Sequence, residues 1–257
     1  MPATHFDYER AGVGYATRRV ADPRIARQVG AALGDARFVL NVGAGAGSYE
    51  PADRRVVAVE PSRTMREQRP AGAAPVVAAV AAALPFADGT FDAAMATLTI
   101  HHWPDVERGL RELRRVSRGP VVLLVGDGPA FLEFWLADYF PDLVAREAAR
   151  HPDIGWVRSI LGGTSTVQDV PIAADCTDGF IEAFYGRPEL LLDPAVRRSQ
   201  SAWGHVDAAT VDAAMAALEA DIACGAWDSR WGRLRHQPSY PGSLRLVIAH
   251  PDPETTD

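Results

Sequence analysis

The 257-residue sequence contains no lysine, so all 26 of its basic residues are arginine. The absence of lysine excludes any mechanism that forms a Schiff base on a lysine side chain. Cysteine is also scarce: Cys176 and Cys224 lie far apart and match neither a metal-binding nor a redox spacing. We therefore expect two reduced thiols and no metal site.

Long apolar runs are missing as well. The longest, residues 75–87, is too short to span a bilayer and contains Pro85. The first ten residues lack the apolar segment of a secretory signal peptide. These features predict a soluble, cytoplasmic protein without a membrane partner.

The charge balance is acidic, with 33 acidic against 26 basic residues, and no basic cluster stands out. This argues against nucleic acid or an anionic membrane surface as the main partner. An apolar share of 47% is ordinary for a soluble globule that buries a sizeable core. The length fits one large domain, or one core with an elaborated cap.

Strand-like and helix-like segments alternate along the first half of the sequence. Short apolar runs predict strands at 38–42, 55–60, 76–79, 93–100 and 121–125. Helical spacing of apolar residues is found at 25–33, 62–68 and 106–116. This alternation indicates βαβ units and a parallel sheet.

The second half is expected to be richer in helix. Strands are predicted at 165–173 and 243–250. Helices are predicted at 131–140, 154–161, 180–185, 194–203 and 208–224.

A glycine-rich loop is the most informative feature of the chain. The first strand opens directly into Gly43, Gly45 and Gly47, which lets the backbone turn sharply and approach a ligand closely. The second strand ends in Glu60, where the ribose of a nucleotide would present its two hydroxyls. Loop and carboxylate together predict a site for a nucleotide-bearing cofactor.

A dinucleotide-binding oxidoreductase is the rival interpretation of this loop. Its fingerprint places the third glycine one residue later, where this chain has Ser48. The spacing therefore favours a different nucleotide cofactor.

Five segments, in this order, resemble the motifs of class I S-adenosylmethionine-dependent methyltransferases that act on small molecules (methyltransferase type 11-like). They are residues 42–47, 60–62, 84–92, 98–103 and 110–116. The resemblance extends to specific motifs over roughly residues 15–127. Beyond residue 128 only the arrangement of helices and strands is similar. It implies S-adenosylmethionine as the cofactor.

In that family the glycine loop packs against the methionine end of the cofactor, and the acid after the second strand holds both ribose hydroxyls. A segment before the first strand closes over the cofactor, and an arginine there can grip its carboxylate. The resemblance thus implies these cofactor-binding residues: Tyr15, Arg18, Gly43, Ala44, Gly45, Gly47, Glu60, Pro61, Ala79, Val80, Thr97 and Leu98.

The sequence departs from the family at two positions. The acid frequent at the end of the first strand is Asn41 here, which keeps hydrogen bonding but loses the charge. The aspartate common near the adenine amine falls at or beside Val80. Both departures bear on the affinity for the cofactor rather than on its identity.

Two adjacent histidines, His101 and His102, open the loop after the fourth strand, at the edge where ligands of open α/β sheets bind. Either could take a proton from an acceptor, or both could be merely structural. Asp127, Trp135 and Asp175 are candidate substrate-binding residues near the same edge. Their ordinary alternatives are turn formation for the two aspartates and core packing for the tryptophan.

We therefore expect an α/β fold: a Rossmann-like, seven-stranded, mostly parallel sheet with the last strand antiparallel, flanked by helices and carrying a helical cap. The chain is expected to form a single methyltransferase domain. Its parts are an N-terminal lid (1–37), a Rossmann-like core (38–173), the helical cap (174–242) and a final strand (243–250).

The function implied by the resemblance is transfer of a methyl group from S-adenosylmethionine to a small organic acceptor. Two alternatives stay open. One is a cofactor-binding scaffold or partner subunit without methyl transfer; the other is an enzyme that uses the sulfonium charge for a different reaction. No motif indicates the acceptor, the methylated atom or the oligomeric state.

Overall fold

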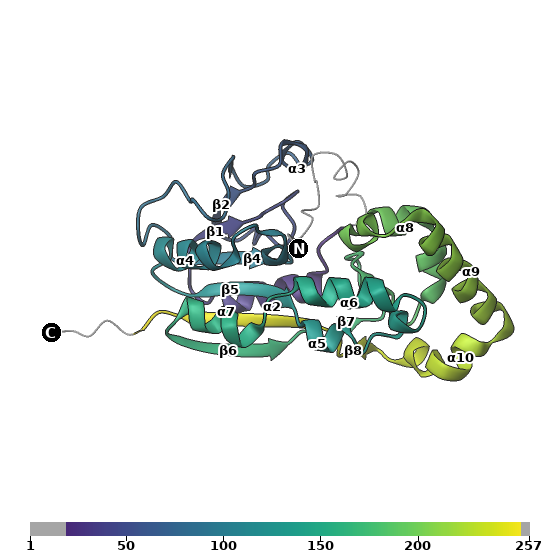
Figure 1. Ribbon diagram of the computed structural model, residues 1–257. Helices are drawn as coiled ribbons and strands as arrows, with labels where there is room; N and C mark the ends of the chain where they lie inside the picture. The colour runs from purple at the N-terminus through teal and green to yellow at the C-terminus, as the bar shows by residue number, and fades with distance from the viewer. Residues whose placement is uncertain (1–18, 253–257) are drawn as a thin grey trace.

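A seven-stranded sheet forms the centre of the molecule in the computed structural model, which describes residues 19–252 (Figure 1). The strand order is β3-β2-β1-β4-β5-β9-β6. The strands are β1 (Phe38–Val42), β2 (Arg55–Val59), β3 (Val76–Val77), β4 (Ala93–Thr97), β5 (Val121–Gly126), β6 (Thr164–Asp169) and β9 (Leu244–His250). Strand β9 runs antiparallel to both its neighbours, and the other pairs are parallel. The predicted fold class is confirmed.

The order of the strands determines where a ligand can bind. Strand β1 pairs with β2 on one side and with β4 on the other, so the chain changes direction across the sheet between β1 and β4. Crevices at the carboxyl ends of such strands are the usual binding sites of open α/β sheets. The glycine loop after β1 and the histidines after β4 both lie at this edge.

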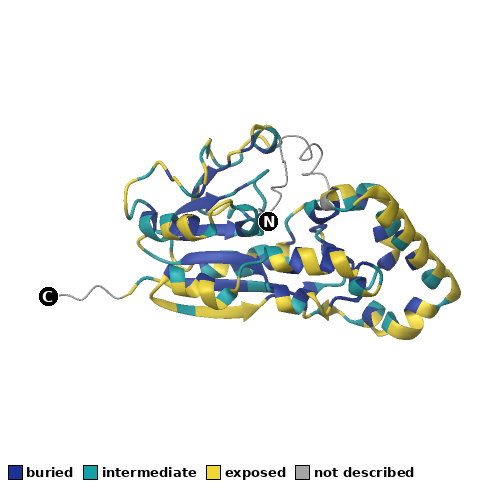
Figure 2. Ribbon diagram, viewed as in Figure 1, coloured by how far each residue is buried: buried dark blue, intermediate teal, exposed yellow. Residues whose placement is uncertain are grey.

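The predicted helices beside the sheet are largely confirmed. They are α2 (Pro23–Ala32), α3 (Arg63–Glu67), α4 (Val106–Val116) and α7 (Ile154–Leu161). Ser62 and Asp105 cap the N-termini of α3 and α4 by accepting from backbone N–H groups. Every residue of β5 is buried, whereas the edge strand β6 is mainly exposed (Figure 2).

Two of the predicted elements are broken in the structure. The expected strand 165–173 ends at Asp169, and Ile172–Ala173 forms β7, which pairs with β8 (Ser239–Tyr240) in a separate sheet. Pro171 lies between them and has no N–H for a strand ladder.

The expected helix 131–140 is also wrong. It is replaced by α5 (Gly128–Phe131) and η3 (Trp135–Asp138), because Phe134 takes an extended conformation with ψ 133°. The next helix, α6 (Pro141–Arg150), was not predicted.

Residues 174–242 hold mostly short helices at the carboxyl end of the parallel strands (Figure 1). Helix α9 (Ala208–Cys224) matches its prediction, whereas the helix predicted at 194–203 divides into α8 (Pro194–Arg198) and η6 (Ser201–His205). The remaining helices are η4 (Ile181–Phe184), η5 (Pro188–Leu192), α10 (Ala226–Trp231) and η7 (Gly232–His236).

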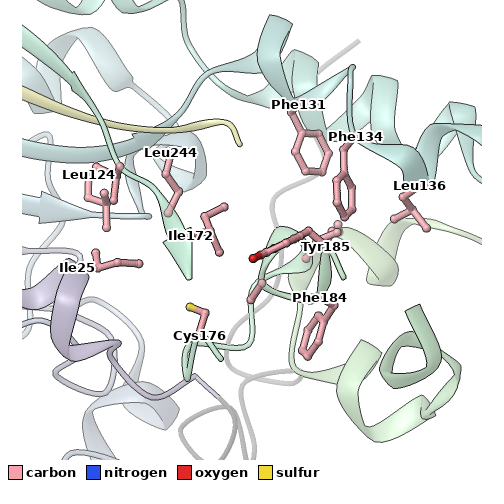
Figure 3. Close-up of a cluster of buried hydrophobic side chains, with 14 of the residues drawn as sticks. Ile25, Leu124, Phe131, Phe134, Leu136, Ile172, Cys176, Phe184, Tyr185 and Leu244 are labelled. Atoms are coloured by element: carbon pink, nitrogen blue, oxygen red, sulfur yellow. The ribbon is translucent and has the colours of Figure 1, made fainter. Parts of the chain in front are cut away.

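An apolar cluster joins this helical part to the sheet (Figure 3). It includes Ile25 from α2, Leu124 from β5, and aromatic side chains such as Phe134 and Tyr185. Trp135 is 2% exposed, and its indole N–H donates to the Tyr185 carbonyl oxygen at 3.0 Å. The cluster holds the helices firmly over the carboxyl edge of the sheet.

Candidate functional site

A cavity of about 230 Å³ lies at the carboxyl ends of β1, β2 and β4. Of the predicted cofactor-binding residues, it is lined by Gly43, Ala44, Gly45, Glu60, Pro61, Ala79, Val80, Thr97 and Leu98. Gly47 belongs to the same loop but does not line the cavity. Tyr15 and Arg18 lie outside the described residues, and the neighbouring Arg19 lines the cavity.

The glycine loop passes so close to the end of β4 that a side chain would not fit. Gly43 has a φ of 69°, and a Cβ atom there would lie 2.2 Å from Thr99 Oγ1. The N–H groups of Gly43 and Ala44 both donate to the carbonyl oxygen of Val59 at the end of β2. These contacts hold the backbone at Gly43 close to the end of β4, so a ligand can lie directly against the main chain there.

Glu60 lies at the rim of this cavity and is 7% exposed. Its two carboxylate oxygens accept from the N–H groups of Gly45 at 2.8 Å and Ser62 at 2.9 Å. Burial raises the pKa of Glu60, while the two N–H donors oppose the shift. The carboxylate is therefore held in one orientation, with lone pairs left for further donors.

Two residues at the cavity have a strained backbone. Among the described non-glycine residues, Tyr49 and Leu98 have positive φ, 63° and 51°. Both line the cavity. Left-handed conformations at bulky residues are costly and are kept where the surrounding structure enforces them, commonly at functional sites.

A buried polar cluster closes the cavity on the side of residues 174–242. Arg19 Nε donates to Asp178 Oδ1 at 2.5 Å, and the Tyr49 hydroxyl donates to Asp178 Oδ2 at 2.8 Å. Asp178 is 1% exposed, and burial together with this carboxylate raises the pKa of Tyr49. The cluster ties the N-terminal segment, the glycine loop and the helical part together.

Replacing Asp178 with asparagine is expected to lower the free energy of unfolding by about 1–2 kcal/mol, because the buried charge opposite Arg19 is lost while the shape is kept. Urea denaturation measures the change. The matched control is Asp175→Asn: the side chain of Asp175 is 83% exposed and pairs with Arg24 at the surface, so stability should hardly change. Equal losses in the two variants would contradict a structural role for the buried cluster.

A second, smaller cavity of about 80 Å³ adjoins the first. The two share Arg19, Leu98 and His102 in their walls. Both predicted histidines line the second cavity, joined by His151, which follows α6. The ring of His101 lies 4.0 Å from that of His102 and 4.6 Å from that of His151, measured between centroids.

His102 is held by a charged network from α6. Arg150 Nη2 lies 2.8 Å from His102 Nδ1, and Arg150 Nη1 donates to Glu147 Oε2 at 2.7 Å. A guanidinium can only donate, so Nδ1 of His102 must be the acceptor and its proton must sit on Nε2. His102 is thereby fixed as a neutral donor and is poorly suited to act as a base through Nε2.

Glu182 from η4 is 2% exposed and also lines the second cavity. Its carboxylate accepts from the N–H and the hydroxyl of Ser243. Burial raises the pKa of Glu182 to about 7, against the smaller opposing effect of Ser243. The Glu182 carboxyl group is therefore partly protonated near neutral pH.

Glu182 should make stability depend on pH. Its folded pKa of about 7 lies above the ordinary 4.5, so the folded chain keeps a proton that the unfolded chain releases between these values. The contribution is complete below pH 4.5 and is lost as pH rises through about 7, a change of roughly 3 kcal/mol in the free energy of unfolding. Denaturation across this range should show a shallower decline for Glu182→Gln and an unchanged one for the exposed control Glu219→Gln. Parallel curves for wild type and Glu182→Gln would contradict the assignment.

The three candidate substrate-binding residues lie elsewhere. Trp135 is in the core, Asp127 forms an ion pair with Arg245 at 3.3 Å, and Asp175 pairs with Arg24. None of them lines either of the two cavities.

The two residues that depart from the family pattern, Asn41 and Val80, differ in burial. Asn41 is fully buried; its side-chain N–H donates to Glu50 at 3.2 Å, and its Oδ1 has no hydrogen-bond partner. Glu50 in turn pairs with Arg69 at 2.8 Å. Val80 is 50% exposed at the mouth of the first cavity.

Comparison with known proteins agrees with this geometry. A family model described as "Methyltransferase domain" matches residues 40–124. The chain is 41% identical over 61 residues to 2-methyl-6-phytyl-1,4-hydroquinone methyltransferase 2, chloroplastic, of Oryza sativa subsp. japonica. That stretch is 23% of this chain and spans only 17% of the rice protein.

Solved structures extend the similarity to most of the chain. A protein of Anabaena variabilis, proposed to be a methyltransferase from an antibiotic biosynthesis pathway, is 28% identical with a TM-score of 0.84, covering 90% of this chain and 98% of that one. Phosphoethanolamine N-methyltransferase 2 of Haemonchus contortus, in complex with S-adenosyl-L-methionine, has the same fold. It is 14% identical with a TM-score of 0.52, covering 96% of this chain and 56% of that one.

The family model over residues 40–124 and the likeness to the Anabaena variabilis structure support a methyltransferase domain in this chain. The resemblance found in the sequence is thus confirmed. None of the helices between residues 19 and 252 combines the length and the hydrophobicity that a membrane-spanning segment needs.

Proposed function

We propose that this protein transfers a methyl group from S-adenosylmethionine in the first cavity to a small organic acceptor in the second. One observation carries the proposal: the cavity bounded by the glycine loop and Glu60 adjoins a second cavity, and Arg19, Leu98 and His102 line both. A donor in the first cavity and an acceptor in the second would meet at these shared residues, beside the strained Leu98 at the end of β4.

The first cavity fits the cofactor on two counts. Glu60 offers a fixed carboxylate at the ribose position, and the wall at Gly43 is too close to Thr99 for any side chain. In this proposal Glu60 holds the ribose hydroxyls, the loop around Gly45 contacts the methionine end, and Pro61 with Ala79 flanks the adenine. S-adenosylmethionine, when bound, supplies an electrophilic methyl group on a sulfonium.

The chain's own part in the reaction is mainly orientation and exclusion of water. Leu98, Phe131 and Ala202 form the apolar part of the second cavity's lining, and residues from 174–242 contribute to its wall. Fixing two reactants in line in a dry cleft accounts for about 7–11 kcal/mol of a barrier when the alignment is good. In this proposal the chain is one domain, with residues 1–37 as lid and 174–242 as cap.

A cytoplasmic location belongs to the same proposal. Cys176 and Cys224 are free thiols, as is usual in a reducing compartment. In this proposal the protein has no nucleic-acid partner.

Methyl-labelled S-adenosylmethionine tests the activity directly. We expect label to appear in a small organic compound when a panel of hydroxyl, amine and activated-carbon acceptors is supplied. Cofactor that binds without any transfer of label would favour a scaffold. Cofactor that is consumed with the label retained on it would favour a different reaction at the sulfonium.

A further inference from the structure

Glu182 is a buried carboxylate in the wall of the second cavity, and it forms no ion pair with any residue from 19 to 252. Its hydrogen bonds come from Ser243, whose N–H donates to Oε1 at 2.9 Å and whose hydroxyl donates to Oε2. A carboxylate offers about four lone-pair sites. The two bonds from Ser243 therefore leave acceptor capacity on both oxygens.

The other charged side chains of this wall are paired. Glu147 pairs with Arg150 at 2.7 Å, and Arg19 pairs with Asp178 at 2.5 Å. Each of these pairs brings one positive and one negative charge, so neither leaves a net charge at the cavity. Over the described part of the chain, Glu182 is thus the charged group of the wall that has no counter-charge.

Neither the histidines of the wall nor Arg245 supplies that counter-charge. Burial lowers the pKa of His101 and lowers that of His151 to about 4, so both rings are neutral near pH 7. Arg245 favours the ionised form of Glu182 only weakly, and it is already engaged in ion pairs of its own. The negative charge of Glu182 therefore remains uncompensated within the wall.

The backbone beside Glu182 holds the carboxylate in place. A Cβ atom on Gly242 would lie 2.6 Å from Oε1, so glycine at this position makes room for the carboxylate. The next residue, Ser243, fixes its orientation through two hydrogen bonds. An unpaired buried charge is costly, and burial raises the pKa of Glu182 to about 7. Groups kept in such an unfavourable state are typical of binding and catalytic sites.

A bound cation would supply the missing charge. A metal ion does not fit, because no group of three or more metal-ligating side chains is found between residues 19 and 252. An organic ammonium group carries one positive charge and several N–H donors, which match the charge and the open lone pairs of Glu182. A hydroxyl group would use a lone pair but leave the charge unpaired.

The rest of the wall suits a small hydrocarbon body. Phe131, Phe180 and Ala202 line the cavity. Its volume of about 80 Å³ gives room for several water molecules, so the ligand must be compact. These features together describe an ammonium group on a short apolar chain or ring.

Resting on the proposed function, we propose that the second cavity takes a small amine as its methyl acceptor, with the ammonium group paired to the Glu182 carboxylate and the hydrocarbon part against Phe131 and Phe180. Glu182 is then the residue that determines specificity for the acceptor. The ammonium group serves as an anchor, and the methyl group need not be transferred to its nitrogen.

Three probes with the same three-carbon chain test this proposal: 3-fluoropropylamine, 3-fluoropropan-1-ol and 3-fluoropropanoate. Each is titrated by fluorine NMR into the full-length protein saturated with S-adenosylhomocysteine, slightly above neutral pH, where the amine still carries its proton. We expect the amine to bind at least about tenfold more tightly than the alcohol, because its hydrogen bonds to Glu182 are charge-assisted. The carboxylate should bind most weakly, since it meets a like charge.

Glu182→Gln keeps the size of the side chain and removes its charge. Its amide oxygen can accept from the Ser243 N–H, and its amide N–H can donate to the Ser243 hydroxyl. We expect the affinity for the amine to fall about tenfold, to the level of the alcohol. The affinity for S-adenosylhomocysteine should be unchanged, because Glu182 does not line the first cavity. Glu219→Gln, at an exposed position on α9, should change neither affinity.

The wild type offers a second measurement in case Glu182→Gln does not fold. Its affinity for the amine should increase as pH rises through about 7, because Glu182 then loses its proton, and its affinity for the alcohol should not increase.

Equal binding of amine and alcohol by the wild type would overturn the proposal, as would tighter binding of the carboxylate or a preference for the amine that persists in Glu182→Gln. If S-adenosylhomocysteine binds while the preference for the amine is absent, only this inference fails. If S-adenosylhomocysteine itself does not bind, the proposed function fails and this inference with it.

Discussion

Gly43→Ala is expected to lower the free energy of unfolding by about 2–5 kcal/mol and to abolish cofactor binding. The left-handed φ of 69° contributes about 1–2 kcal/mol for any residue with a Cβ atom. The contact of that Cβ with Thr99 Oγ1, at 2.2 Å, adds about 1–3 kcal/mol as the loop and the end of β4 move apart. Urea denaturation and titration with S-adenosylhomocysteine measure the two effects.

The chain offers a matched control in Gly34. Its φ is 55°, but a Cβ atom there would meet open space, so Gly34→Ala should cost only the backbone strain, about 1–2 kcal/mol, and leave cofactor binding intact. Adding Thr99→Ala to Gly43→Ala should recover part of the lost stability. A loss no greater at Gly43 than at Gly34 would mean that the close approach of the loop to β4 is wrong.

Glu60→Gln is expected to weaken binding of S-adenosylhomocysteine by about 2–4 kcal/mol, roughly 30- to 1000-fold. The substitution keeps the size of the side chain but replaces charge-assisted hydrogen bonds to the ribose hydroxyls by weaker ones. It also turns an amide N–H₂ toward Gly45 or Ser62, whose N–H groups need acceptors. Isothermal titration calorimetry gives the affinity directly.

Glu67→Gln is the control for this substitution. Glu67 lies on α3, with its side chain 61% exposed and paired with Arg63, so its loss should leave the cofactor affinity unchanged. An affinity unaffected by Glu60→Gln would contradict the assignment of the ribose to this carboxylate.

The parts of the fold that could be predicted depend on contacts between residues close in sequence. Strand β5 is a continuous run of buried residues, and α4 has its apolar spacing and its cap at Asp105 within one segment. The glycine loop and Glu60 were readable because a strand, a turn and a second strand follow one another directly. Local patterns of this kind determine both the element and the site it carries.

The part of the site that residues 174–242 contribute could not be predicted, because it is assembled from distant segments. Asp178 meets Arg19 across 159 residues of sequence, and Glu182 meets Ser243 across 61. His151 gave no signal, since it follows a helix that the pattern did not predict. Short helices such as η4 take their conformation from packing rather than from their own periodicity.

A crystal structure of the protein with S-adenosylhomocysteine would show whether the glycine loop and Glu60 hold the cofactor. We expect both ribose hydroxyls within hydrogen-bonding distance of the Glu60 carboxylate and the amino-acid end of the ligand beside the glycine loop at Gly43 and Gly45. A ligand bound away from Glu60, or a first cavity that takes up a nicotinamide dinucleotide in preference to S-adenosylhomocysteine, would contradict it.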